Sequence, residues 1–120
     1  MIEKYQVLVS ELLKATTDGK INWEPTSTTG EFKVTLGNNA VSIYQHKSIA
    51  NFICAPTTMD QETYVTLSIW DKDGNVIDDV WSVKGETDAD YRTLYELFEA
   101  VRRSCNHVDE AIDVILSKLQ

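Results

Sequence analysis

The feature that most constrains the fold is a hairpin pattern in the second half of the chain. Residues Thr63–Trp70 alternate between polar and apolar side chains, and Val76–Val83 form the expected return strand. Successive side chains of a strand point to opposite faces, so this alternation predicts a strand with one apolar face. The segment Asp71–Asn75 between them contains the Asp-Gly pair that favours a tight β-turn. The chain is therefore expected to contain an antiparallel sheet.

The register of this hairpin follows from where its charges would lie. A two-residue turn at Asp73-Gly74 places Asp79 opposite Ser68 and Trp70 opposite Ile77. A three-residue turn would instead place Asp79 against the core residue Leu67, at a cost on the order of several kcal/mol for an unpaired charge. We therefore predict the two-residue turn. In that register one face carries a group of large side chains, joined by a tyrosine of the preceding hairpin: Tyr44, Tyr64, Trp70, Ile77, Trp81 and Val83.

The first half of the chain divides into helical and strand-like segments. Residues 3–17 place apolar side chains three and four positions apart, which predicts an amphipathic helix that ends at Asp18-Gly19. Residues 21–23 predict a short first strand, and residues 32–43 predict a hairpin that turns at Gly37-Asn38-Asn39. Residues 46–61 lose the alternation, so we expect a loop or a broken edge strand there.

Two helices follow the strands. Thr87, Asp88 and Asp90 are expected to begin a helix that reaches about residue 105, and Asn106 is expected to cap a last helix. The predicted fold is α+β, with an N-terminal helix, a four- to five-stranded antiparallel meander sheet and two C-terminal helices packed on the sheet. Because the chain has 120 residues and no long linker, we expect one α+β domain over residues 1–120.

The charge of the chain limits its partners. Eleven Lys and Arg residues stand against nineteen Asp and Glu residues, a net charge of −8 that lies mostly after residue 70. Proteins that bind nucleic acids or anionic membranes need a basic surface, so we predict neither partner. The apolar runs are far shorter than the ~20 residues of a membrane span. Two cysteines outside any C-x-x-C motif, and no apolar signal peptide, predict a reduced, cytoplasmic protein.

Several segments of the chain carry a family resemblance. These segments are Leu12–Trp23, the tyrosine-led strand at Tyr64, the D-x-D-G turn at Asp71–Gly74, and Leu94-Tyr95 with Arg102-Arg103 ahead of a short Val108-Asp109 helix. Together they resemble a loosely related group of small bacterial and phage α+β proteins, over most of the chain. The resemblance implies the architecture. The group is uncharacterised, so it implies no catalytic residues.

The sequence contains no strong motif for catalysis or for metal binding. Cysteines and histidines supply one close pair, Cys105 and His107, whereas zinc sites usually show two. His46 could form a dyad with Ser48 or Cys54, but the pattern positions no third group. We therefore predict no metal and no cofactor, and we find no support for an enzymatic activity.

The aromatic face is the best candidate for a functional site, and three roles remain open for it. It could be a second core covered by a helix, an interface with a protein or a second copy, or a pocket that stacks a planar ligand. In the last case Arg102 and Arg103 would clamp a carboxylate or phosphate. We predict a non-enzymatic protein-interaction or regulatory module that uses this aromatic, acidic sheet face, with a homodimer as one form. The alternatives are a protein that binds or sequesters a nucleotide-like small molecule and, third, a hydrolase using His46. The candidate binding residues are Tyr44, Tyr64, Trp70, Trp81, Arg102 and Arg103.

Overall fold

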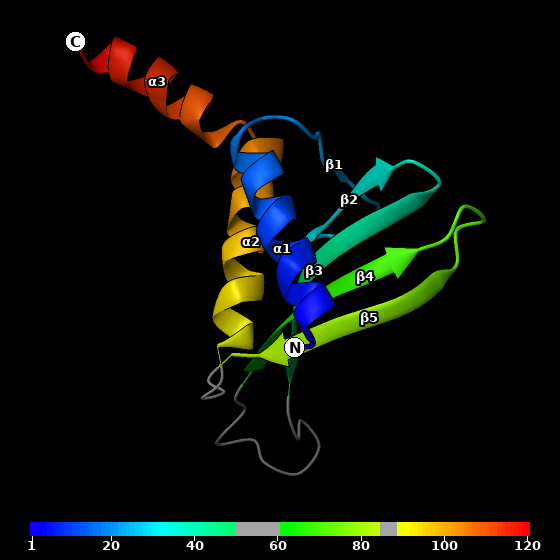
Figure 1. Ribbon diagram of the computed structural model, residues 1–120. Coiled ribbons are helices and arrows are strands. Elements are labelled where there is room, and N and C mark those ends of the chain that lie inside the picture. Colours follow the sequence, from blue (N-terminus) through cyan, green and yellow to red (C-terminus); the bar gives the residue numbers. More distant parts are fainter. Residues whose placement is uncertain (50–60, 85–88) are drawn as a thin grey trace.

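The chain folds as one antiparallel sheet with helices before and after it (Figure 1). The computed structural model describes residues 1–49, 61–84 and 89–120. Its elements are α1 (Glu3–Thr17), β1 (Glu24–Pro25), β2 (Glu31–Leu36), β3 (Asn39–Ile49), β4 (Gln61–Trp70), β5 (Val76–Val83), α2 (Asp90–Cys105) and α3 (Val108–Leu119). Each strand pairs with the next in the order β1-β2-β3-β4-β5. The predicted α+β class, the element order and the antiparallel meander are therefore confirmed, with five strands in the sheet.

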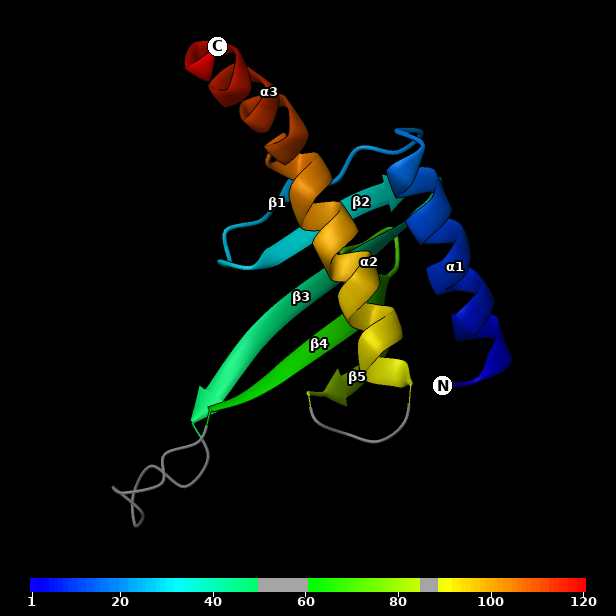
Figure 2. The same cartoon turned by 90° about the vertical axis from the view of Figure 1, so that its left-hand side faces the viewer.

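The helices α1 and α2 lie side by side against one face of the sheet (Figure 2). Their apolar stripes meet the apolar side of the strands, as the alternation and the helical period predict. Phe32 of β2, for example, packs against Phe98 of α2 with ring centroids 6.0 Å apart. The buried core consists of Val9, Leu12, Trp23, Phe32, Val34, Val41, Ile43, Val65, Leu67, Leu94, Leu97, Phe98 and Val101.

The last helix joins the domain through α2. Only Asn106 and His107 separate the two helices, and His107 has a left-handed backbone conformation with φ of 53°. An ion pair between Arg103 and Asp109, 2.6 Å long, spans the turn. The helix α3 extends beyond the end of α2 (Figures 1 and 2), and none of its residues is buried. It begins after His107, not after a cap formed by Asn106, because the Asn106 backbone N–H continues α2 to the Arg102 carbonyl.

Two predicted strand boundaries are wrong. The first strand is Glu24–Pro25, not residues 21–23, because Trp23 is buried in the core and its indole N–H donates to the Thr16 hydroxyl at 2.9 Å. The third strand does not stop before His46 but continues to Ile49, paired with β4 from Gln61 onward. The rest of the predicted loop, residues 50–60, lies outside the described residues, as do the predicted cap residues Thr87 and Asp88.

The β4–β5 hairpin keeps the predicted register but not the predicted turn. The turn has three residues, Lys72 to Gly74, with Gly74 at φ of 86° and the Asp71 N–H bonded to the Asn75 carbonyl at 2.8 Å. Glycine in this position is typical of three-residue hairpin loops. An irregularity then restores the register, because Trp70 pairs with Val76 instead of Ile77, and Ile77 has no partner in β4. Beyond it Asp79 lies opposite Ser68, as predicted.

Candidate functional site

The side of the sheet opposite α1 and α2, here called the open face, carries four neighbouring rings. Tyr44 and His46 alternate along β3 and therefore share this face. Tyr64 of β4 pairs directly with His46, and Trp81 of β5 pairs with Thr66, the next residue of β4 on the same side. We call these four side chains, Tyr44, His46, Tyr64 and Trp81, the aromatic ladder. Helices α1 and α2 both pack on the other face (Figure 2), so neither of them forms a second core on the open face, which was one of the three roles left open for it.

The rings of the aromatic ladder contact one another in sequence. Tyr44 and His46 stack with centroids 4.7 Å apart, and His46 and Tyr64 stack at 5.0 Å. Tyr64 and Trp81 are tilted by 59° at 5.7 Å. Offset and edge-to-face arrangements at these distances are favourable for aromatic rings. The ladder is therefore held in shape by its own contacts, and it ends on Trp81, whose side chain is 57% exposed.

Sequence reasoning did not assign His46 to this group. The sequence pattern predicts that the strand ends before His46, and the histidine is then only a candidate base of a catalytic dyad. The signal that could have found it is the continued alternation of Ser42, Tyr44 and His46 along one strand. In the structure the Thr66 hydroxyl lies 3.5 Å from the Nε2 atom of His46. Ser48 lies on the same strand, and Cys54 lies outside the described residues.

Trp70 also lies on the open face, but its side chain already contacts two other residues of the chain. Its indole N–H donates to the buried Ser42 hydroxyl at 2.9 Å. The Lys33 ammonium lies 3.9 Å from the centre of its ring, in a cation–π contact. Trp70 thus closes the end of the sheet nearest the β4–β5 turn. We expect it to be a weaker site for a partner than Trp81.

The acidic pair on β5 divides between the two faces. Asp79 lies on the open face, opposite Ser68. Asp78 lies on the helix side and accepts a hydrogen bond of 2.6 Å from the Tyr5 hydroxyl of α1. Burial and this hydrogen bond raise the pKa of Tyr5 to about 12. Of these two carboxylates, only Asp79 therefore adds acidic charge to the open face. Asp78 contributes instead to the contact between α1 and the sheet.

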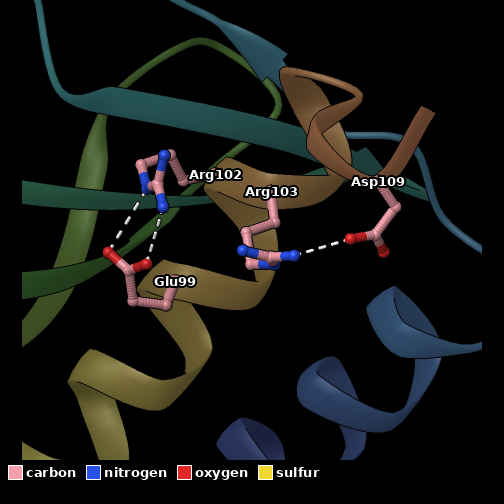
Figure 3. A network of polar contacts seen from close by, with 4 residues as sticks. All are labelled: Glu99, Arg102, Arg103 and Asp109. Atoms are coloured by element: carbon pink, nitrogen blue, oxygen red, sulfur yellow. Dashed lines mark hydrogen bonds and ion pairs between the residues drawn. The ribbon is translucent and has the colours of Figure 1, made fainter. Parts of the chain in front are cut away.

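The two candidate arginines do not join the aromatic ladder. Both belong to α2, which lies on the opposite side of the sheet (Figure 2). Arg102 donates to both carboxylate oxygens of Glu99, at 3.3 and 2.8 Å, and Arg103 pairs with Asp109 (Figure 3). The guanidinium beside Glu99 lowers the pKa of that carboxyl group. A carboxylate or phosphate clamp added to the aromatic face is thus not formed by these residues.

The described part of the chain offers no group of three residues that could hold a metal ion. Cys105 is a free, half-buried thiol, and burial together with the negative charge of Glu24 raises its pKa. A cavity of about 490 Å³ lies on the helix side, between the end of α1 and the α2–α3 turn, and its lining includes Asn22, Ser104 and His107. Among the helices that the structure describes, none has the length and apolar character to cross a bilayer.

Comparisons of the chain with known proteins found no relative. Neither a scan against models of protein families, nor a search of curated proteins, nor a search of solved structures produced a match.

Proposed function

We propose that this chain is a non-enzymatic protein-interaction module that binds a partner on the open face of its sheet. One observation carries the proposal: helices α1 and α2 both pack on one face of the sheet, while the other face carries the aromatic ladder, in which Trp81 is 57% exposed and the other three side chains are half-buried. Exposed clusters of large apolar side chains usually mark interaction sites, and Trp and Tyr are enriched among the residues that dominate binding energy.

The ladder suits a macromolecular partner because it is rigid before binding. Tyr64 is held between His46 and Trp81, so binding of a partner carries less of the entropic cost of ordering these rings. A polyanionic partner is disfavoured by the net charge of −8. On the described part of the open face, Lys33 is already in contact with Trp70. These features favour a protein surface over a nucleic acid.

The test compares two variants that remove equally exposed apolar side chains from opposite sides. Trp81 on the open face is 57% exposed, and Val7 on α1 is 56% exposed. Tagged wild-type protein, Trp81→Ser and Val7→Ser would be used to capture proteins from a cell lysate, with quantification by mass spectrometry. Truncating a dominant interface residue typically weakens binding by at least about 30-fold. We expect Trp81→Ser alone to lose a captured protein.

Circular dichroism of both variants verifies that they remain folded. Because both side chains are largely in solvent, we expect both spectra to match the wild type. An identical set of captured proteins for wild type, Trp81→Ser and Val7→Ser, in a lysate that also contains untagged copies of this chain, would contradict the proposal.

A further inference from the structure

Within the described part of the chain, the last helix has an apolar stripe that is left largely exposed. Ile112, Ile115, Leu116 and Leu119 recur at helical spacing, and their exposed fractions range from 43% to 77%. The helix has 12 residues, and isolated helices shorter than about 12–15 residues are marginal in water. A helix of this length with no buried residue therefore requires a surface to cover its stripe.

The chain carries such a surface but cannot bring α3 to it. The open face and α2 are on opposite sides of the sheet, and layers pack about 10 Å apart, so a helix on the open face would lie about 20 Å from α2. The connection of two residues, Asn106 and His107, spans at most about 7 Å. The Arg103–Asp109 ion pair also holds the start of α3 beside α2. Among the described residues, the stripe of α3 and the open face therefore do not meet within one copy, whereas they can meet between two copies.

We propose that α3 of one copy packs on the open face of a second copy, whose α3 packs on the first in return. This inference rests on the proposed function and names the occupant of the open face as a second copy of this chain. A helix laid on a sheet face is the same packing that α2 already makes on the other side, where Leu94, Leu97 and Val101 are buried. The exchanged α3 helices would give the sheet a helical layer on both faces.

The sizes of the two surfaces favour a reciprocal exchange over a single contact. A 12-residue helix is about 18 Å long and about 10 Å wide, which matches the part of the sheet formed by β3, β4 and β5. A half-exposed large side chain offers on the order of 100 Å², so the four residues of the stripe supply about 400 Å² and the ladder a similar area. One contact would then bury about 800 Å² in total, whereas stable interfaces bury about 1,200–2,000 Å². Two contacts reach that range, and they also close the assembly.

The net charge predicts how this dimer responds to salt. Each copy carries −8, so two copies repel each other, while the surfaces that meet are largely apolar. Added salt screens the repulsion without weakening apolar contacts. The dissociation constant should therefore fall as sodium chloride is raised from about 50 to about 300 mM. An interface formed by ion pairs would respond in the opposite direction.

The experiment uses sedimentation velocity on the full chain with three variants. Leu116→Glu places a charge in the stripe of α3, and Trp81→Glu places one in the ladder. Val114→Glu is the control, because Val114 is 59% exposed but points away from the stripe. We expect wild type and Val114→Glu to be dimeric at about 50 μM, and each of the other variants to dissociate at least about 30-fold more readily. If Trp81→Glu fails to fold, Ile77→Glu takes its place, because Ile77 is another exposed side chain of β5.

Mixing the two weakened variants gives the decisive result. Leu116→Glu keeps an intact open face, and Trp81→Glu keeps an intact α3, so a mixture can form one complete helix-on-sheet contact. We expect the mixture to contain more dimer than either variant alone at the same total concentration, although a single intact contact of about 800 Å² makes this heterodimer weaker than the wild-type dimer. A contact between like surfaces, α3 with α3 or face with face, would not recover on mixing and would overturn the exchange.

Two further outcomes separate the inference from the proposed function. If the wild-type chain stays monomeric at about 50 μM, a second copy is excluded as the occupant of the open face. The face would remain available to another protein. A dimer that persists in Trp81→Glu and Ile77→Glu would show that the open face is not the surface used, which would count against both proposals.

Discussion

Replacing Thr16 with valine keeps the size of a buried side chain but removes its hydroxyl group. That hydroxyl accepts the indole N–H of Trp23 at 2.9 Å and donates to the Leu12 carbonyl at 2.7 Å. The carbonyl keeps its helical N–H partner, whereas the buried indole loses this acceptor. An unsatisfied buried donor costs about 1–3 kcal/mol, so Thr16→Val should lower the free energy of unfolding by about that amount.

Urea unfolding followed by circular dichroism measures this loss, and a double-mutant cycle assigns it to the hydrogen bond. In a Trp23→Phe background the indole is absent, so adding Thr16→Val should change the free energy of unfolding by less than about 0.5 kcal/mol. Thr16→Ser keeps the hydroxyl and loses one methyl group, which should cost about 1 kcal/mol in either background. If Thr16→Val costs the same with and without Trp23, the hydrogen bond is not the source of the loss and the reasoning is refuted.

Two other predictions concern turn geometry and pH. Gly19 and Gly30 both have positive φ, but a Cβ at Gly30 would also lie 2.8 Å from the Gln45 carbonyl oxygen. Gly19→Ala should therefore cost about 1–2 kcal/mol in urea unfolding and Gly30→Ala at least about 1 kcal/mol more, and equal costs would contradict the role of that contact. The pKa of Tyr5 is raised to about 12, whereas an unfolded tyrosine ionises near pH 10, so stability should fall as pH rises from 10 to 12. Tyr5→Phe should make the urea midpoint fall less over that range, and an unchanged fall would refute the contribution of Tyr5.

Periodicity was sufficient to predict most of the fold. The helices over residues 3–17 and 90–105, and the long hairpin, each have one apolar side that repeats at the period of its element. One error occurs where a single side chain is buried in the core against the local pattern. Trp23 looks like a strand residue in the sequence, but its ring is buried and its indole N–H is bonded to Thr16, so the strand begins at Glu24, three residues after the predicted start.

The candidate site was predicted in part. Alternation alone placed Tyr44, Tyr64 and Trp81 on one face, because a strand's side chains alternate whatever covers them. Alternation cannot tell whether a helix covers that face, since three helices were available and the answer depends on how they pack in space. The association of Arg102 with the ladder failed for the same reason, because α2 lies on the opposite face. His46 was omitted because β3 was expected to end too early.

The β4–β5 hairpin shows how two local constraints are reconciled, and it leads to a last prediction. Loop chemistry favours a three-residue turn with Gly74 at positive φ, while the charge of Asp79 must stay on the open face. A regular ladder from that turn would bring Asp79 against Leu67. The chain satisfies both constraints by leaving Ile77 without a partner, so Ile77 shifts the register of the rest of β5 by one residue.

Deleting Ile77 should therefore be tolerated, although deletions inside strands normally turn every later side chain to the wrong face. Without it, Val76 opposite Trp70 would be followed directly by Asp78 opposite Ile69, a regular ladder that keeps both the turn and the position of Asp79. We expect the free energy of unfolding in urea to change by less than about 1 kcal/mol, since the lost side chain is 58% exposed. Deleting Val80 offers no such compensation and should unfold the chain, because Trp81 would turn into the core. Similar losses for the two deletions would show that Ile77 is not the residue that sets the register.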